Sequence, residues 1–422
     1  MTWVILGIFL IAYALIASER IPRTYAALGG ASAMVLVGGV NATSAFFHQD
    51  TAIDWNVVFL LLGMMIIVSV LKQTGLFEFI AIWAAKRSRG RPFLLMTLLI
   101  LITAMASAVL DNVTTVLLIA PVTLLVCDRL GISPVPYLLA EVMSSNIGGA
   151  ATLVGDPPNI IIASKGGLTF NQFLSNMTPV TGLLLLVFIG MAWLIWGRRL
   201  VVDPERVSRV MALDEREAIH DRPLLVKALG CLVLALIGFV LQGVTGIDPS
   251  LVALMAAGLL IVVSGLEPGD YLEEVEWGTL VFFMGLFIMV GGLVQSGLIE
   301  RFGRVLVNSL GDHRFIGATA LLWLSGILSA VVDNIPYVAT MAPLVHDLVT
   351  AQHAQPLWWA LALGADLGGN ATAIGASANV VVLGIAARNK HPISFWEFTK
   401  YGSLVAGVTL AVAWGYWTLR YL

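Results

Sequence analysis

The stretch SAVLDN at residues 107–112 recurs as SAVVDN at residues 329–334, which lies 222 positions further along the chain. At nearly the same spacing, GGAATLVGDPPN at 148–159 is followed by GGNATAIGASAN at 368–379. Three further residues, Trp55, Gly63 and Pro121, have an identical residue 222 positions later in the chain. So many matches in the same order indicate an internal duplication.

The duplicated chain is too apolar for a soluble protein. Of its 422 residues, 59% are hydrophobic and 12% are charged, and the mean hydropathy is +0.92. Soluble domains carry roughly 25% charged residues. The composition therefore predicts an integral membrane protein and excludes a soluble enzyme. A net charge of −3 offers no basic patch for nucleic acid, and two cysteines exclude a disulfide scaffold or a cysteine metal cluster. We expect no cofactor and no metal site.

The apolar segments fall into two kinds. Uninterrupted runs, each of about the length that crosses a bilayer, lie at 2–18, 24–40, 55–71, 179–197, 224–243, 250–264, 278–295 and 401–420. Runs interrupted by Asp, Asn, Gly, Pro or Thr lie at 93–126, 136–164, 315–350 and 357–387. Irregular backbone in lipid persists only where protein or a water-filled cavity surrounds it. We therefore expect an all-α polytopic protein of ten spans, in which each half has a re-entrant hairpin and a broken helix.

Five crossings per half give the two halves opposite topology. We expect a first inverted repeat at 1–197, a charged cytoplasmic linker at 198–222 and a second inverted repeat at 223–422. In this predicted topology, all but five of the 23 Lys and Arg residues fall on one side of the membrane. By the positive-inside rule that side is cytoplasmic. Both termini are then outside a cytoplasmic (inner) membrane. The five on the other side are Lys165, Arg301, Arg304, Arg314 and Arg420.

Inverted repeats with broken helices that meet near the midplane are typical of secondary transporters. Ionisable residues inside the bilayer are costly and mark ion or substrate pathways. Of the 26 acidic residues, those that fall inside the predicted membrane segments are Asp111, Glu141, Asp156, Asp333 and Asp366. Each requires a proton, a cation or several backbone N–H donors.

Two hairpin tips and two breaks contain the candidate ligands. At the tips, Asp111 and Asp333 either cap the turn or bind a proton or cation, with neutral oxygens supplied by Asn112, Thr114, Thr115 and Asn334. The breaks add Asn146, Gly149, Thr152, Asn159, Asp366, Asn370, Thr372 and Asn379. Asp156 precedes two prolines, and a helix cap is at least as good an interpretation as a ligand. Glu141 either snorkels to the surface or belongs to a proton route with Asp111 and Asp333.

The strings DNVTT at 111–115, GDPPN at 155–159 and GGNATAIGASAN at 368–379 resemble the ArsB/NhaD/P-protein permeases of the ion transporter superfamily. The resemblance covers essentially the whole chain. It implies opposed hairpins, a scaffold that can form a homodimer, and elevator-like motion of the hairpin domain. It also implies a soluble ATPase partner if the solute is arsenite.

The dicarboxylate carriers of that superfamily have a Ser-Asn-Thr-like tip, and here Asp111 and Asp333 stand at the Ser position. This difference suggests proton coupling and disfavours an anionic polycarboxylate. We therefore expect an antiporter of the lipid bilayer that exports arsenite or antimonite against protons. The alternatives are sodium(lithium)/proton antiport at the same carboxylates and, third, a citrate- or dicarboxylate-like carrier.

Two other classes of membrane protein fit the sequence less well. A channel requires a continuous polar stripe along several helices, whereas the polar residues here gather at the tips and breaks. An intramembrane aspartyl protease requires two facing aspartates, which Asp111 and Asp333 could mimic. However, Asp156 lacks the Gly-x-Gly-Asp pattern of that class.

Overall fold

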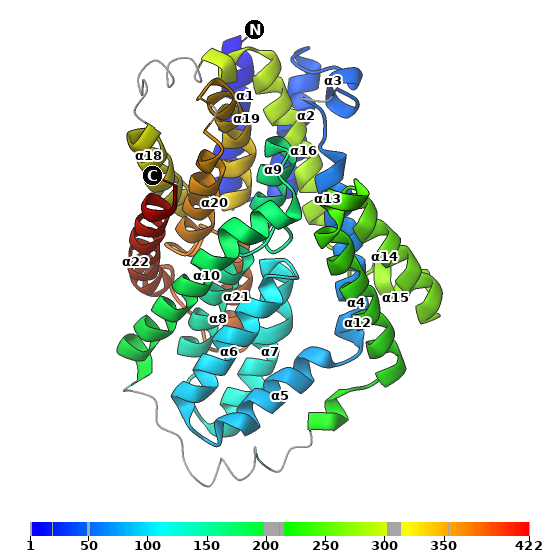
Figure 1. The fold of residues 1–422 in the computed structure, drawn as a ribbon, viewed down its shortest axis with the longest axis vertical. Helices are drawn as coiled ribbons and strands as arrows, with labels where there is room; N and C mark the ends of the chain where they lie inside the picture. Colours follow the sequence, from blue (N-terminus) through cyan, green and yellow to red (C-terminus); the bar gives the residue numbers. More distant parts are fainter. Residues whose placement is uncertain are drawn as a thin grey trace.

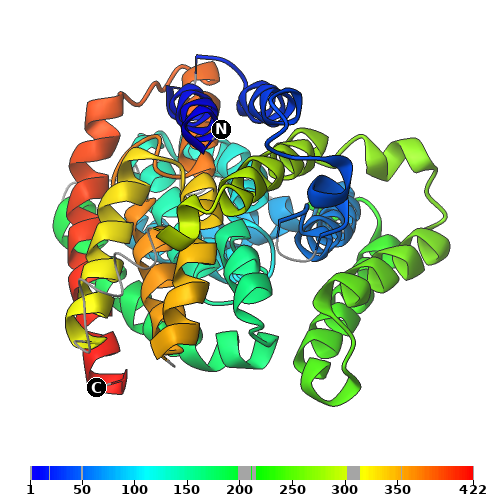
Figure 2. The same cartoon turned by 90° about the horizontal axis from the view of Figure 1, so that it is seen from above.

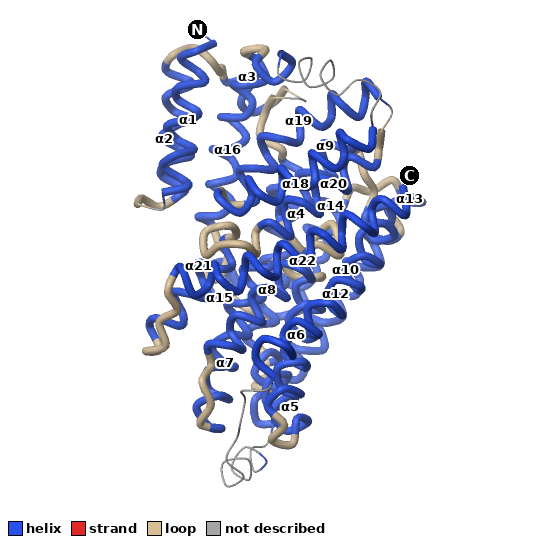
Figure 3. Tube along the Cα trace, turned by 90° about the vertical axis from the view of Figure 1, so that its left-hand side faces the viewer, coloured by secondary structure: helices blue, strands red, loops and turns tan. Residues whose placement is uncertain are grey.

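In the computed structural model the described residues are 2–18, 20–48, 51–197, 211, 215–301, 314–352 and 354–421. This part of the chain is helical throughout and contains no strand (Figure 3), which confirms the all-α polytopic fold. Six described helices are long and apolar enough to cross a bilayer: α4 (Trp55–Gln73), α7 (Asn112–Leu130), α10 with η1 (Phe170–Gly197), α12 (Arg222–Val240), α16 (Trp277–Gln295) and α22 (Phe395–Tyr421). The total of ten spans stays a prediction, and most of the linker predicted at 198–222 lies outside the described residues.

Six of the plain helices form two bundles, and each bundle contains one helix from the other half of the chain. Helices α1 (Thr2–Ser18) and α2 (Arg23–Leu36) pack against α16, whereas α12 and α14 (Pro249–Ser264) pack against α4. Figures 1 and 2 show both bundles, with α12 and α14 projecting from the rest of the molecule when it is seen from above. We call these six helices the scaffold group.

Glycines permit the exchanged helices to approach closely. A Cβ atom on Gly63 of α4 would lie 2.7 Å from the backbone carbon of Ala253 on α14. At the duplicated position on α16, a Cβ atom on Gly285 would lie 2.9 Å from the backbone carbon of Ala27 on α2. Both distances are shorter than packed side chains allow. The same residue type therefore makes the same close contact in each bundle.

The interrupted segments form the expected hairpins and broken helices, which we call the hairpin group. One hairpin is α6 (Pro92–Ser107) with α7, and the other is α18 (Arg314–Val331) with α19 (Asn334–Gln352). One broken helix is α8 (Val135–Gly149) with α9 (Pro157–Gly166), and the other is α20 (Pro356–Gly368) with α21 (Ser377–Arg388). The hairpins and broken helices contact one another within and across the two halves. Every break thus faces a hairpin tip.

Glycines also bring each broken helix onto its hairpin. A Cβ atom on Gly148 would lie 2.3 Å from the carbonyl oxygen of Ala104, and one on Gly368 would lie 2.3 Å from that of Gly326. Close packing is therefore one function of these glycines. Short helices that the sequence did not predict also connect the elements: α3 (Ala42–Phe46), α5 (Leu76–Ser88), η2 (Glu215–Ala218), α13 (Gln242–Thr245) and α15 (Pro268–Leu272).

Candidate functional site

The unwound stretch of each broken helix is held by one asparagine and one threonine. Asn159 Nδ2 donates to the carbonyl oxygens of Gly149 and Thr152, both at 3.2 Å. Asn379 Nδ2 makes the equivalent bonds to Gly369 and Thr372, both at 2.8 Å. These bonds satisfy carbonyl groups that the breaks leave without helical partners.

The threonine hydroxyls join each break to a hairpin. Thr152 Oγ1 donates to the carbonyl oxygen of Ala108, and Thr372 Oγ1 donates to that of Ala330, both at 2.5 Å. Both hydroxyls are therefore committed to holding the tips in place.

Asparagines from the two halves meet between the breaks. Asn146 Nδ2 donates to Asn370 Oδ1 at 2.9 Å and to Asn379 Oδ1 at 3.1 Å. Asn112 Nδ2, at the tip of the first hairpin, donates to Asn146 Oδ1 at 3.1 Å. Helices far apart in the sequence thus contribute to one buried polar network. We use the name central amide cluster for the buried residues Asn112, Asn146, Asn159, Asn334, Asn370 and Asn379.

Asp156 is a member of this network, and its interpretation as a helix cap is wrong. Its side chain forms no capping hydrogen bond to α9. Instead, Asp156 Oδ2 accepts from Asn112 Nδ2 at 2.9 Å and from Asn334 Nδ2 at 3.3 Å. Both hairpin tips therefore converge on one fully buried carboxyl group.

Asp366 is fully buried, and among the described residues neither of its oxygens has a hydrogen-bond partner. Asp156 Oδ1 and Asn159 Oδ1 are buried and unpartnered as well. The side chain of Asn159 lies within interaction range of Asp366. No Lys or Arg in the described ranges forms an ion pair with Asp156 or Asp366. On these three residues, four buried acceptor oxygens therefore lack a donor within the described part of the chain.

The tip aspartates do not join the central amide cluster. Asp111 caps α7, because its carboxylate accepts from the backbone N–H of Thr114 at 2.8 Å and from the Thr114 hydroxyl. Asp333 accepts from the backbone N–H of Ile335 at 3.0 Å and forms an ion pair with Arg23 at 3.7 Å. The Thr115 hydroxyl is buried and has no partner in the described part of the chain.

Glu141 does not snorkel to the surface. It is 1% exposed on α8, where it accepts a hydrogen bond from the Thr123 hydroxyl of α7. Its second oxygen, Oε2, has no partner among the described residues. A role for Glu141 in a proton route stays a prediction.

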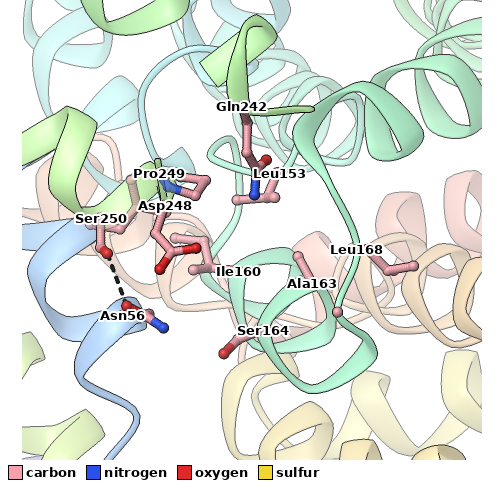
Figure 4. Close-up of a pocket in the computed structure, with 12 residues that line it drawn as sticks. Asn56, Leu153, Ile160, Ala163, Ser164, Leu168, Gln242, Asp248, Pro249 and Ser250 are labelled. Atoms are coloured by element: carbon pink, nitrogen blue, oxygen red, sulfur yellow. Dashed lines mark hydrogen bonds between the residues drawn. The ribbon is translucent and has the colours of Figure 1, made fainter. Parts of the chain in front are cut away.

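Several cavities lie between the scaffold group and the hairpin group, and two of them reach the first break and the second hairpin tip. One, of about 230 Å³, is shown in Figure 4. It extends from Gln242 and Asp248, near the start of α14, to Leu153 in the first break. The other, of about 420 Å³, extends from Arg20 to Asp333 and the start of α21. The cavities thus reach the first break and the second tip separately.

Glu276 provides a testable pH dependence beside the site. It precedes α16, outside the predicted span, and its burial, followed by the nearby charge of Asp111, raises its pKa to about 7. The folded protein then retains a proton that the unfolded chain releases above the ordinary value of 4.5. Stability should therefore fall as the pH rises from 4.5 to about 7.

We expect Glu276→Gln to remove this decrease and to raise the melting temperature of the detergent-solubilised protein most clearly above pH 7. The matched control is Glu273→Gln, because Glu273 is exposed in the same loop. Parallel melting curves for Glu276→Gln and the natural chain at every pH would contradict this assignment.

Three residues of the site are not among the candidate ligands that the sequence predicts. For Asp156, local sequence favours a cap as much as a ligand. No local pattern connects Arg23 and Ser377, which contact the second tip, to Asp333. The sequence offers one signal against a cap at Asp156, since Pro158, the second residue of the following helix, lacks an N–H group that a cap could bind.

Comparison with protein families and known proteins agrees with this architecture. Residues 13–364 match CitMHS, described as "Citrate transporter". An uncharacterized transporter of Mycobacterium tuberculosis is 56% identical over 100% of this chain and 99% of its own length. The human P protein is 35% identical over 96% of this chain and 58% of its own length. The P-protein resemblance is therefore confirmed, whereas ArsB and NhaD specifically stay predictions.

Two solved transporters share the fold. The YdaH transporter of Alcanivorax borkumensis has a TM-score of 0.61 at 15% identity, covering 99% of this chain and 97% of its own. MtrF of Neisseria gonorrhoeae, described as illuminating a class of antimetabolite efflux pumps, has a TM-score of 0.62 at 10% identity, covering 100% and 94%. At these identities the likeness concerns the fold alone.

Proposed function

This chain belongs to the CitMHS citrate transporter family, and from that premise we propose that it is a proton-coupled secondary transporter in which Asp366 carries the proton. Membrane transport is common to the family, to the mycobacterial relatives named as transporters and to the two solved structures. The coupling ion, the solute and the mechanism are the new elements of the proposal. The observation that carries it is the unpartnered carboxyl of Asp366 beside Asn159.

The duplication identifies what Asp366 lacks. Asn146 stands 220 positions before Asp366, and Asn159 stands 220 positions before Asn379. In one pair, Asn146 Nδ2 donates to Asn379 Oδ1. In the related pair, Asp366 replaces the donor and Asn159 Oδ1 is left without one. Because Asn159 Nδ2 already donates to two carbonyl oxygens, a good bond between Asn159 and Asp366 requires a proton on the carboxyl group.

The central amide cluster favours a small neutral solute with hydroxyl groups. Its amides both donate and accept, so they can exchange their mutual bonds for bonds to hydroxyls. Asp156 and Asp366 would repel an anion such as citrate at this position. We therefore propose arsenite or antimonite as the exported solute, exchanged for protons. Loss of the proton from Asp366 on one side and its return on the other would couple the two fluxes.

Movement of the hairpin group against the scaffold group would give alternating access. The cavities at Leu153 and at Asp333 lie along the boundary between the two groups, where such a movement would open and close them. In the predicted orientation the first opens outward and the second toward the cytoplasm. This elevator-type cycle in the inner membrane, and a dimer formed through the scaffold group, are parts of the proposal.

A second candidate is sodium(lithium)/proton antiport. Four buried acceptor oxygens without donors, on Asp156, Asp366 and Asn159, are also the ligands that a hard cation prefers. A cation and a proton would then compete for Asp366. This alternative retains the same site and changes only the transported ion.

The test is proton flux in proteoliposomes that contain a trapped pH dye, with pulses of arsenite, antimonite, sodium, lithium or citrate. We expect a proton signal with arsenite or antimonite and none with citrate. A signal with sodium or lithium alone would favour the second candidate. Movement of a labelled solute with no proton signal would contradict proton coupling in either form.

A further inference from the structure

Arg23 is a cationic side chain that reaches from the scaffold group into the hairpin group. It lies at the first residue of α2, and its Nη2 donates to Thr279 Oγ1 of α16 at 3.2 Å. Its guanidinium group also stacks over the Phe282 ring of α16, 5.1 Å from the ring centre. Its position is therefore fixed by two scaffold helices.

The other side of the same guanidinium group holds the second hairpin. Arg23 Nη1 donates to Ser377 Oγ at the first turn of α21 and lies 3.7 Å from Asp333 Oδ2. Ser377 Oγ donates in turn to Asp333 Oδ2. One scaffold side chain thus contacts both the tip of the second hairpin and the start of the second half of a broken helix.

These contacts lie at the end of the cavity that begins at Arg20. The Arg23 and Asp333 side chains are 29% and 16% exposed, so water screens the pair only in part. Other charged or titratable groups face the pair: Glu276 near Arg23, and Tyr13, Tyr337 and Asp156 near Asp333. The pair is therefore part of a charged boundary between the two groups of helices.

We propose that Arg23 is a clamp that holds the tip of the second hairpin and the start of α21 against the scaffold group, and that this clamp must open before the hairpin group can move. This proposal rests on the proposed alternating-access function. Arg23 is a positioning residue, because it touches neither the central amide cluster nor its carboxyls in the described structure. It acts by setting the balance between conformations.

Val381 offers a direct readout, because it lines the clamped cavity. In the full chain carrying Cys127→Ala, Cys231→Ala and Val381→Cys, the new thiol would react with a membrane-impermeant maleimide when the cavity opens. Charged hydrogen bonds of this kind are substantial, so we expect Arg23→Gln to raise the labelling rate by about tenfold. Arg20→Gln, in the same loop and cavity, is the matched control and should leave the rate unchanged.

Three further variants keep the test decisive if Arg23→Gln is poorly folded. Ser377→Ala removes the shared hydroxyl and should raise labelling by a smaller factor than Arg23→Gln. Arg23→Asp should label quickly, and the reversed pair Arg23→Asp with Asp333→Arg should restore slow labelling. Equal labelling of Arg23→Gln and Arg20→Gln, or a reversed pair as fast as Arg23→Asp, would overturn the clamp.

Labelling requires no solute and no proton gradient, so it distinguishes the clamp from the proposed function. Fast labelling in Arg23→Gln together with no proton signal for any tested solute would support the clamp and reject proton coupling. Unchanged labelling together with a normal arsenite signal would support the transport function and reject the clamp.

Discussion

Asp366→Asn is expected to fold at least as stably as the natural chain and to lose its proton signal completely. The new amide would donate to Asn159 Oδ1, as Asn146 donates to Asn379 Oδ1 in the related half. Relief of an unsatisfied buried polar group is worth about 1–3 kcal/mol. Because an amide does not titrate, the variant would imitate the protonated carboxyl permanently.

Two measurements on purified protein test this result. The melting temperature in detergent should be equal or higher, and the solute-dependent dye signal in proteoliposomes should fall to the level of empty vesicles. Asp347→Asn is the matched control, since Asp347 is an exposed acid on the second hairpin and should retain full activity. A full proton signal in Asp366→Asn would exclude Asp366 as the proton carrier.

Local sequence patterns predicted the elements of this fold because they act over short distances. Apolar runs, glycine pairs and prolines located the hairpins and the broken helices, and the duplication showed that they occur twice. For Asp111 the sequence leaves a cap and a proton- or cation-binding role open, and in the structure its carboxylate caps its own helix.

The exchange of α4 and α16 between the bundles could not be predicted in this way. The exchange depends on which helix packs against the glycine of α4 or α16. Gly63 of α4, for example, packs against Ala253 of α14, and these two residues are far apart in the sequence. The contact between Arg23 and Asp333 depends on the same exchange, because Arg23 and Thr279 come from different halves.

Asp156 illustrates a local rule that failed for a local reason. An Asp before a helix normally accepts from the N–H groups of the second or third helical residue. Here the second residue is Pro158, which has no N–H group, and the N–H of Asn159 donates to the backbone carbonyl of Asp156 at 3.0 Å. The carboxyl group is therefore free to bind the two hairpin tips. Pro158 removes one capping donor already in the sequence, whereas the bond of the Asn159 N–H is visible only in the structure.

Replacing Asp156 by Asn or by Ala should therefore separate the structural role of this side chain from the role of its charge. In Asp156→Asn a carbonyl oxygen remains to accept from Asn112 and Asn334, so the fold should persist. In Asp156→Ala the buried amide of Asn334 loses its acceptor and a small cavity is left, which should cost about 1–3 kcal/mol for the orphaned donor alone. We expect transport to be lost in both variants and the melting temperature to fall only in Asp156→Ala.

Melting temperature and solute flux, measured on the same preparations, distinguish the possible roles of this carboxyl. Transport that survives in Asp156→Asn would show that Asp156 only anchors the tips and that Asp366 alone carries the coupling. An Asp156→Ala variant as stable as the natural chain would contradict the convergence of both tips on this carboxyl. If both variants behave as expected, the double variant Asp156→Asn with Asp366→Asn should show neither proton flux nor solute flux. Each half of the chain contributes one acid to a single site, and neither acid can replace the other.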